Sequence, residues 1–167
     1  MSGYDLNTFS KRDRFDDHGY AMKTSIENSN PFGKDSIKKW NWKNAAEIEM
    51  LDPYFKPIEQ YRLVEFDRDW NTRNQNFSGN QILSSAHSSI EHMEYGRISL
   101  NAQQYKIGND FSGIRTQLLT NWRQKGFNVQ LDASYLKSKT ANSNQFLRHK
   151  LDVSKQIKKF RIGYKDD

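Results

Sequence analysis

The sequence contains no cysteine, which excludes disulfide bonds, thiolate zinc sites and cysteine nucleophiles. It has no run of about 18 apolar residues, the length that a membrane-spanning helix needs. Its first residues lack the basic start and the apolar stretch of about 7 to 15 residues that mark a secretory signal. We therefore expect either a cytoplasmic protein, or a mature form or an excised section of a longer chain. Gly-x-Ser-x-Gly elbows and glycine-rich phosphate loops are also missing, so we predict no enzymatic activity and no cofactor.

Hydrophobic residues are scarce, at 35% of the 167 residues, and the mean hydropathy is −0.99. Aromatic residues nevertheless reach 13%. Disordered chains are poor in aromatics, because they cannot bury enough apolar surface to offset chain entropy. We therefore predict a folded chain that forms a single β domain over residues 1–167. The net charge of +6 permits attraction to nucleic acid, anionic glycans or lipid headgroups, but requires none of them.

Apolar and polar residues alternate along the C-terminal part of the chain. From Ile114 to Trp122 the even-numbered positions form the more apolar side, whereas from Phe127 to Tyr135 the odd-numbered positions do so. Successive side chains of a strand point to opposite faces, so this period of two predicts two strands that each have one apolar and one polar face.

The change of parity between these two strands predicts a hairpin. Facing residues of a hairpin share a side, so the connection must contain an even number of residues. A two-residue turn at Lys125 and Gly126 satisfies this condition, and glycine tolerates the positive φ that tight hairpin turns require. The resulting register sets Trp122 opposite Val129 and Leu118 opposite Ala133.

Similar alternation predicts further strands over residues 20–27, 40–50, 97–103, 147–154 and 160–164. Residues 58–70 are less regular, because the adjacent Leu63 and Val64 require a bulge or burial on both sides of a strand. The stretch from Thr72 to Ser89, rich in Asn and Ser, is predicted as a long loop. The fold class is therefore all-β: an antiparallel up-and-down meander of about eight strands, forming a barrel or part of a larger barrel or sheet. Because the pattern stops within a strand, we expect further strands to belong to the sheet.

Alternation alone leaves two alternatives for the apolar face. A soluble barrel or sandwich hides that face inside, whereas an outer-membrane barrel turns it towards lipid. Long strands with aromatic residues near their ends, such as Trp122, Phe127 and Tyr135, favour the membrane. The low hydropathy and the presence of His92 and His149 near apolar stripes favour a soluble protein. In the membrane alternative, the water-filled lumen is lined by Arg115, Gln117, Asn128, Gln130 and Asp132.

One short segment combines basic and aromatic residues and is the strongest candidate for binding. Its tryptophans can stack on sugar rings or bases while its lysines contact phosphate. In the soluble alternative we expect it to bind a glycan or another polyanion, with nucleic acid less favoured. Alternation divides the segment, because consecutive side chains alternate between the two faces of a strand. The candidate residues are Lys38, Lys39, Trp40, Trp42 and Lys43.

Three carboxylates, Glu65, Asp67 and Asp69, follow one another at intervals of two. On a strand they would project from one face, where an oxygen-preferring cation such as calcium could bind. Arg62 and Arg68 lie close in sequence, however, and favour ion pairs instead. We therefore predict no metal site.

Three segments resemble pieces of large β-rich cell-envelope proteins of Bacteroidota: Ser2 to Ser10, Asp16 to Lys23 and Tyr61 to Asn71. The resemblance implies an outer-membrane β-barrel or a surface-sheet protein, of which this chain would be one section. It implies a location in the bacterial outer membrane, with membrane lipid or further strands of a parent protein as partners. It identifies no catalytic residues.

Overall fold

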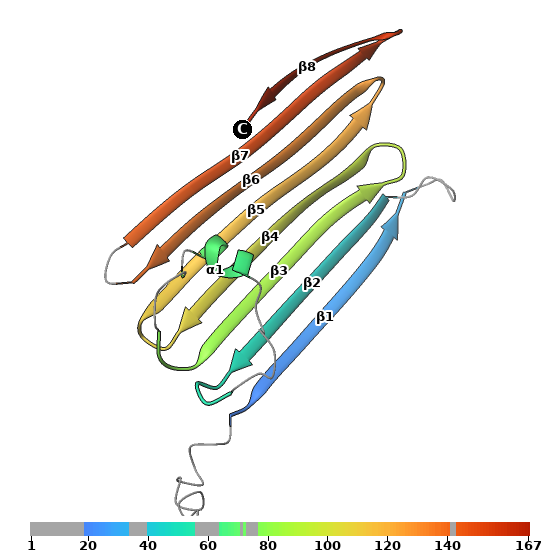
Figure 1. The fold of residues 1–167 in the computed structure, drawn as a ribbon. Coiled ribbons are helices and arrows are strands. Elements are labelled where there is room, and N and C mark those ends of the chain that lie inside the picture. Colours follow the sequence, from blue (N-terminus) through green and yellow to red (C-terminus); the bar gives the residue numbers. More distant parts are fainter. Residues whose placement is uncertain (1–18, 34–39, 56–63, 71, 73–76, 141–142) are drawn as a thin grey trace, which may run out of the picture.

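A computed structural model describes residues 19–33, 40–55, 64–70, 72, 77–140 and 143–167. These residues form one antiparallel sheet of eight strands, in the order in which the strands follow one another along the chain, together with one short helix (Figure 1). The elements are β1 (Ala21–Phe32), β2 (Trp40–Leu51), α1 (Val64–Trp70), β3 (Gln81–His92), β4 (Gly96–Ile107), β5 (Phe111–Gln124), β6 (Phe127–Lys139), β7 (Ser143–Ile157) and β8 (Phe160–Asp166).

The all-β meander of about eight strands is confirmed, but the sheet is open. Each strand pairs with its neighbours in sequence, and within the described ranges β1 and β8 each pair with one strand only. The sheet therefore has two free edges. A closed barrel, one of the two forms that the sequence allowed, is not what these strands build.

The hairpin of β5 and β6 has the predicted register. Trp122 pairs with Val129 and Leu118 pairs with Ala133. The two-residue turn has positive φ at both positions, 46° at Lys125 and 80° at Gly126. Two consecutive positive φ values are typical of the type I′ turn, whose twist matches that of the flanking strands.

Every strand pairing in the sheet advances residue by residue on both strands, so parity decides which face a side chain occupies. We call one side the polar face: the odd-numbered residues of β1 to β5 and of β8, and the even-numbered residues of β6 and β7. The opposite side, made by the other strand residues, is the apolar face. We call the end of the sheet where β4 turns into β5 the α1 end, and the opposite end the turn end.

Helix α1 packs on the polar face near the turn between β4 and β5 (Figure 1). Trp70 is only 1% exposed, and Phe66, one helical turn earlier, contacts the edge of the Tyr105 ring at a centroid distance of 5.1 Å. Gly113 leaves room for this packing, because a Cβ there would lie 3.0 Å from Cζ3 of Trp70. The buried cluster consists of Trp70, Tyr105, Ile107, Phe111 and Leu136.

The strand predicted over residues 58–70 is wrong where the structure describes it, since Val64–Trp70 is helical. Phe66 and Trp70 are four residues apart, so a helix points both towards the sheet. In a strand they would also share a face, and the sequence pattern alone did not separate the two possibilities.

The long loop predicted from Thr72 to Ser89 is wrong from Gln81 onward, where β3 begins. Serine is common in β3 and has little preference for strands, which suggested a loop. Strand propensity depends strongly on context, and β3 lies between two strands that pair with it along all 12 of its residues. Backbone pairing on both sides outweighs the composition.

We expect Trp70→Ala to lower the free energy of unfolding by about 3–5 kcal/mol, because it removes the centre of a buried cluster and leaves a cavity. Trp42→Ala is the matched control, since Trp42 is 45% exposed on the apolar face. Denaturant unfolding of both variants under the same conditions measures the difference. Equal losses for the two tryptophans would contradict the packing described above.

Candidate functional site

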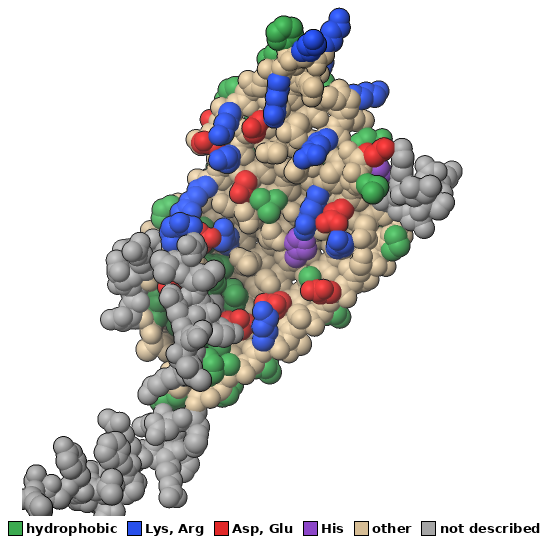
Figure 2. Space-filling model, turned by 45° about the vertical axis from the view of Figure 1, so that its right-hand side comes forward, with side chains coloured by type: hydrophobic (Ala, Val, Ile, Leu, Met, Phe, Trp, Pro, Cys, Tyr) green, Lys and Arg blue, Asp and Glu red, His purple; other side chains and the backbone are tan. Residues whose placement is uncertain are grey.

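The polar face carries an open hollow of about 630 Å³. Its lining includes residues from β3 to β8. One side of the hollow is basic, the other side carries both positive and negative charges and is called the mixed side, and Ser99, Leu119 and Asn121 lie between them. Figure 2 shows this face: charged side chains are spread over it, and hydrophobic ones are few away from the grey segments. Arg97 and His87 line the basic side, and Asp132, Lys150, Asp152 and Lys165 line the mixed side.

A polar network across β2, β3 and β4 fixes the basic side. Glu91 accepts from two cations: its carboxylate oxygens lie 2.7 Å from Nζ of Lys43 and 3.3 Å from Nη1 of Arg97. Nη2 of Arg97 lies 3.1 Å from Nε2 of His87. Because a guanidinium only donates, Nε2 accepts and Nδ1 carries the proton that His87 donates to Asn101. The network orients Arg97 beside the hollow.

The mixed side alternates in charge between neighbouring strands. Asp132 on β6 pairs in register with Lys150 on β7, and Asp152 on β7 pairs with Lys165 on β8. Nε2 of Gln117 donates to Oδ1 of Asp132 at 2.9 Å. Cross-strand neighbours of opposite charge are favourable, and the ammonium of Lys150 lies 3.4 Å from Oδ1 of Asp167, which follows β8.

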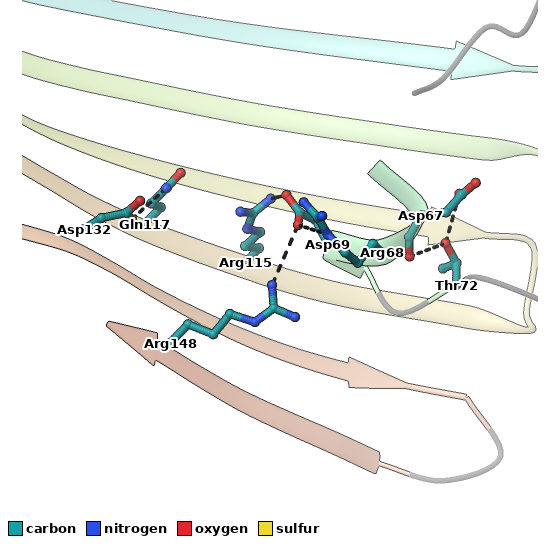
Figure 3. A network of polar contacts seen from close by, with 8 residues as sticks. All are labelled: Asp67, Arg68, Asp69, Thr72, Arg115, Gln117, Asp132 and Arg148. Atoms are coloured by element: carbon teal, nitrogen blue, oxygen red, sulfur yellow. Dashed lines mark hydrogen bonds and ion pairs between the residues drawn. The ribbon is translucent and has the colours of Figure 1, made fainter. Parts of the chain in front are cut away.

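Asp69 links α1 to two strands of the polar face (Figure 3). Its Oδ2 accepts from Nη1 of Arg115 on β5 at 2.9 Å, and its Oδ1 lies 3.8 Å from Nη1 of Arg148 on β7. Oδ1 also lies 3.6 Å from Nε of Arg68. The Arg115 and Asp69 side chains are only 20% and 23% exposed, so this contact is better shielded than an ordinary surface pair.

The five residues predicted to line a lumen share one face of the sheet, as expected from their parity. Arg115, Gln117, Asn128, Gln130 and Asp132 all lie on the polar face. Gln130 and Asp132 also line the hollow. That this face meets the water of a lumen stays a prediction.

The predicted binding segment is only partly described. Lys38 and Lys39 lie outside the described residues. Trp40 and Trp42 lie on the apolar face, whereas Lys43 lies on the polar face with its ammonium held by Glu91. The division that alternation predicted for these three residues is present, and binding of a glycan or another polyanion by the segment stays a prediction.

An aromatic stack at the turn end of the apolar face was only partly anticipated. The ring of Trp40 lies 5.9 Å from those of Tyr95 and Trp122 and 4.6 Å from that of His92, measured between centroids. Phe32 stacks on the outer side of Trp40 at 6.3 Å. Trp122 was expected near the turn, but His92 joins it only because β3 is a strand. Recognising β3 would have revealed the stack.

The carboxylates of Asp67 and Asp69 do not converge, and the side chain of Glu65 lies outside the described residues. Asp67 accepts from the hydroxyl of Thr72 at 3.1 Å, while Asp69 points to Arg115. A helix rotates residues two apart to different sides, so the common face assumed for a strand does not form. In the described part of the chain, no three His, Asp or Glu residues are grouped as metal ligands.

We expect Asp69→Asn to lower the free energy of unfolding by about 1–2 kcal/mol, because either orientation of the amide places an NH₂ group against a guanidinium. Asp67→Asn is the matched control on the same helix, since its Oδ1 still accepts from Thr72. Denaturant midpoints of the two variants provide the measurement. A loss at Asp67 equal to that at Asp69 would exclude a specific role for the contact with Arg115 and Arg148.

Comparison of the chain with family models, with curated proteins and with solved structures finds no match. Within the described residues, no helix combines the length and the apolar character that crossing a membrane would demand. Functional inference therefore rests on the two faces of the sheet.

Proposed function

We propose that this chain is a section of a bacterial outer-membrane β-barrel with a structural or transport-related role and no catalytic activity of its own. The apolar face contacts lipid, and the polar face lines a water-filled interior. The observation that carries this proposal is the distribution of charge between the two faces.

Charged side chains of the strands gather on the polar face. The strand residues of that face include Lys23, Glu47, Glu91, Arg115 and Asp152, among others, drawn from every strand. On β1 to β7 every charged residue of the apolar face lies near the end of its strand, which leaves a central band of these strands free of Asp, Glu, Lys and Arg. An outer-membrane barrel has such a band, about 25 Å tall, on its outer surface. On β8, Asp166 pairs with Leu151 near the middle of β7 and contacts His149. The apolar-face exceptions are Lys106, Lys137, Lys139, Lys155 and Asp166.

Large side chains of this band are open to the surroundings. Ile26 and Leu147 are each 72% exposed, and Leu100, near the middle of the sheet, is 53% exposed. No second layer covers the apolar face in the described part of the chain, where α1 packs on the opposite side. Contiguous exposed apolar surfaces mark contact with a membrane or with another protein, and the absence of charge across the band from β1 to β7 favours lipid.

The band crosses the sheet obliquely. On β1 to β3 it reaches the α1 end, at Met22, Met50 and Ile82, whereas on β6 it gives way to Lys137 before that end. At the turn end it gives way to Lys155 on β7, whereas on β8 it extends to Phe160. Strands of a membrane barrel tilt by about 35–45°, so a level bilayer meets successive strands at shifted positions. The oblique band is what tilted strands require.

The aromatic stack of Phe32, Trp40, His92, Tyr95 and Trp122 borders this band at the turn end. Tyrosine and tryptophan concentrate where lipid chains meet headgroups, because their rings are apolar and their NH or OH groups are polar. The stack therefore supports a membrane interface at this level of the sheet.

The two free edges support assembly into a larger sheet. Unpaired backbone groups cannot remain in lipid, where each costs several kcal/mol, so a sheet that enters a membrane must close. We infer that β1 and β8 pair with further strands, supplied by the rest of a parent protein or by another chain. Closure would place the hollow and the charged networks of the polar face in the interior.

Tryptophan quenching by lipid tests this proposal. Two variants each keep one tryptophan, Trp42 on the apolar face or Trp70 beneath α1, with phenylalanine at the other three positions. In vesicles with brominated acyl chains we expect Trp42 to lose most of its emission and Trp70 to lose little, because bromine quenches only on contact. Unbrominated vesicles provide the reference, and circular dichroism verifies that both variants fold. Equal quenching, or a folded chain that does not float with the vesicles, would contradict the proposal.

A further inference from the structure

Three lysines project from the apolar face at its α1 end. Lys106 on β4 pairs in register with Ser112 on β5, which pairs with Lys139 on β6. Lys137 lies two residues from Lys139 on the same strand and therefore on the same face. All three lysines are exposed. We call Lys106, Lys137 and Lys139 the lysine cluster.

The spacing of the cluster allows its ammonium groups to converge. Neighbouring strands are about 4.8 Å apart, and residues two apart on a strand are separated by about 6.7 Å. The three Cα atoms therefore lie within roughly 12 Å of one another, and a lysine side chain reaches about half that distance. One phosphate group can be contacted by all three ammonium groups, with the Ser112 hydroxyl between the strands.

The backbone beneath the cluster is held by packing on the other face. Tyr105 and Leu136, the sequence neighbours of Lys106 and Lys137, are 3% and 7% exposed and belong to the cluster under α1. Ser138, between Lys137 and Lys139, is 2% exposed. The strands that carry the lysines are thus fixed before any ligand binds, which lowers the entropic cost of binding.

In the described part of the chain, no acidic group neutralises the cluster. Among the described residues, none of the three lysines forms an ion pair. The apolar face has one acidic residue in the described strands, Asp166, which lies on β8 and contacts His149. Asp110, in the turn between β4 and β5, uses its Oδ2 to accept from the backbone NH and the hydroxyl of Ser78. Three like charges held close together without a counterion attract an anion.

The geometry points to a binding site for the phosphate of an anionic lipid headgroup at the lysine cluster, an inference that rests on the proposed function. The charge-free band ends at this level, with Ile114 and Tyr135 following Ser112 and preceding Lys137 on their strands. A lipid whose chains lie along the band therefore places its phosphate beside the lysines. At the turn end the described strand residues of the apolar face include one lysine, Lys155, whose ammonium lies 4.4 Å from the centre of the Phe127 ring. Lys125 and Lys158 occupy turns at that end.

Spin-labelled lipids test the site in vesicles of phosphatidylcholine that contain the full chain. Electron spin resonance gives the ratio of the association constants of labelled phosphatidylglycerol and labelled phosphatidylcholine. A lysine near an anionic lipid contributes about five-fold to binding at low salt. We expect the unmodified chain to prefer phosphatidylglycerol by at least about five-fold, and the triple variant Lys106→Gln, Lys137→Gln, Lys139→Gln to lose that preference.

The matched control is Lys23→Gln, Lys150→Gln, Lys165→Gln, which removes the same charge from the polar face and should keep the preference. An equal loss in both triple variants would show that net charge alone is responsible, and would overturn the site. Loss of the preference on adding inorganic phosphate at constant ionic strength would identify a site for free anions and would also overturn it. If the chain enters phosphatidylcholine vesicles but the cluster variant keeps its preference, the site fails while the proposed function stands. If the chain does not enter them, the proposed function itself fails.

Discussion

The antiparallel pairing of eight strands, residue against residue, is the constraint on which the rest of the structure depends. Because each strand pairing advances without skipping a position, parity alone assigns every strand side chain to a face. A shift of one residue in any pairing would carry the charges of that strand onto the apolar face. The separation of charge from apolar surface is therefore a property of the whole sheet, and not of any one strand.

A single-layer sheet cannot bury both of its faces. The two faces of this sheet differ in what covers them. On the polar face, α1 covers the α1 end through Trp70, and the remainder carries ion pairs and the hollow. On the apolar face, side chains such as Leu147 and Ile26 have no cover within the described residues. In the proposed membrane setting, lipid on one side and water on the other would satisfy both surfaces, and further strands at β1 and β8 would satisfy the edges.

The sequence predicted those parts of the fold that depend on local pattern. The register of β5 and β6 followed from parity and from Gly126, and the shared face of the predicted lumen residues followed from the same rule. Helix α1 was missed because Phe66 and Trp70 share a face in either conformation. Strand β3 was missed because its serines give little local preference, whereas pairing on both sides decides its structure. The Glu91 network depends on β3, so it could not be predicted.

Solvent accessibility along β5 is the most direct measurement of the two-faced sheet in a membrane. The chain has no cysteine, so single cysteines from Ile114 to Trp122 can each carry one spin label. In vesicles, we expect contact with oxygen, which dissolves in lipid, to be greatest at even-numbered positions, and contact with a water-soluble nickel complex to be greatest at odd-numbered ones. Two results would contradict the assignment of lipid to the apolar face. Accessibility could fail to alternate with a period of two, or oxygen could favour the odd-numbered positions and the nickel complex the even-numbered ones.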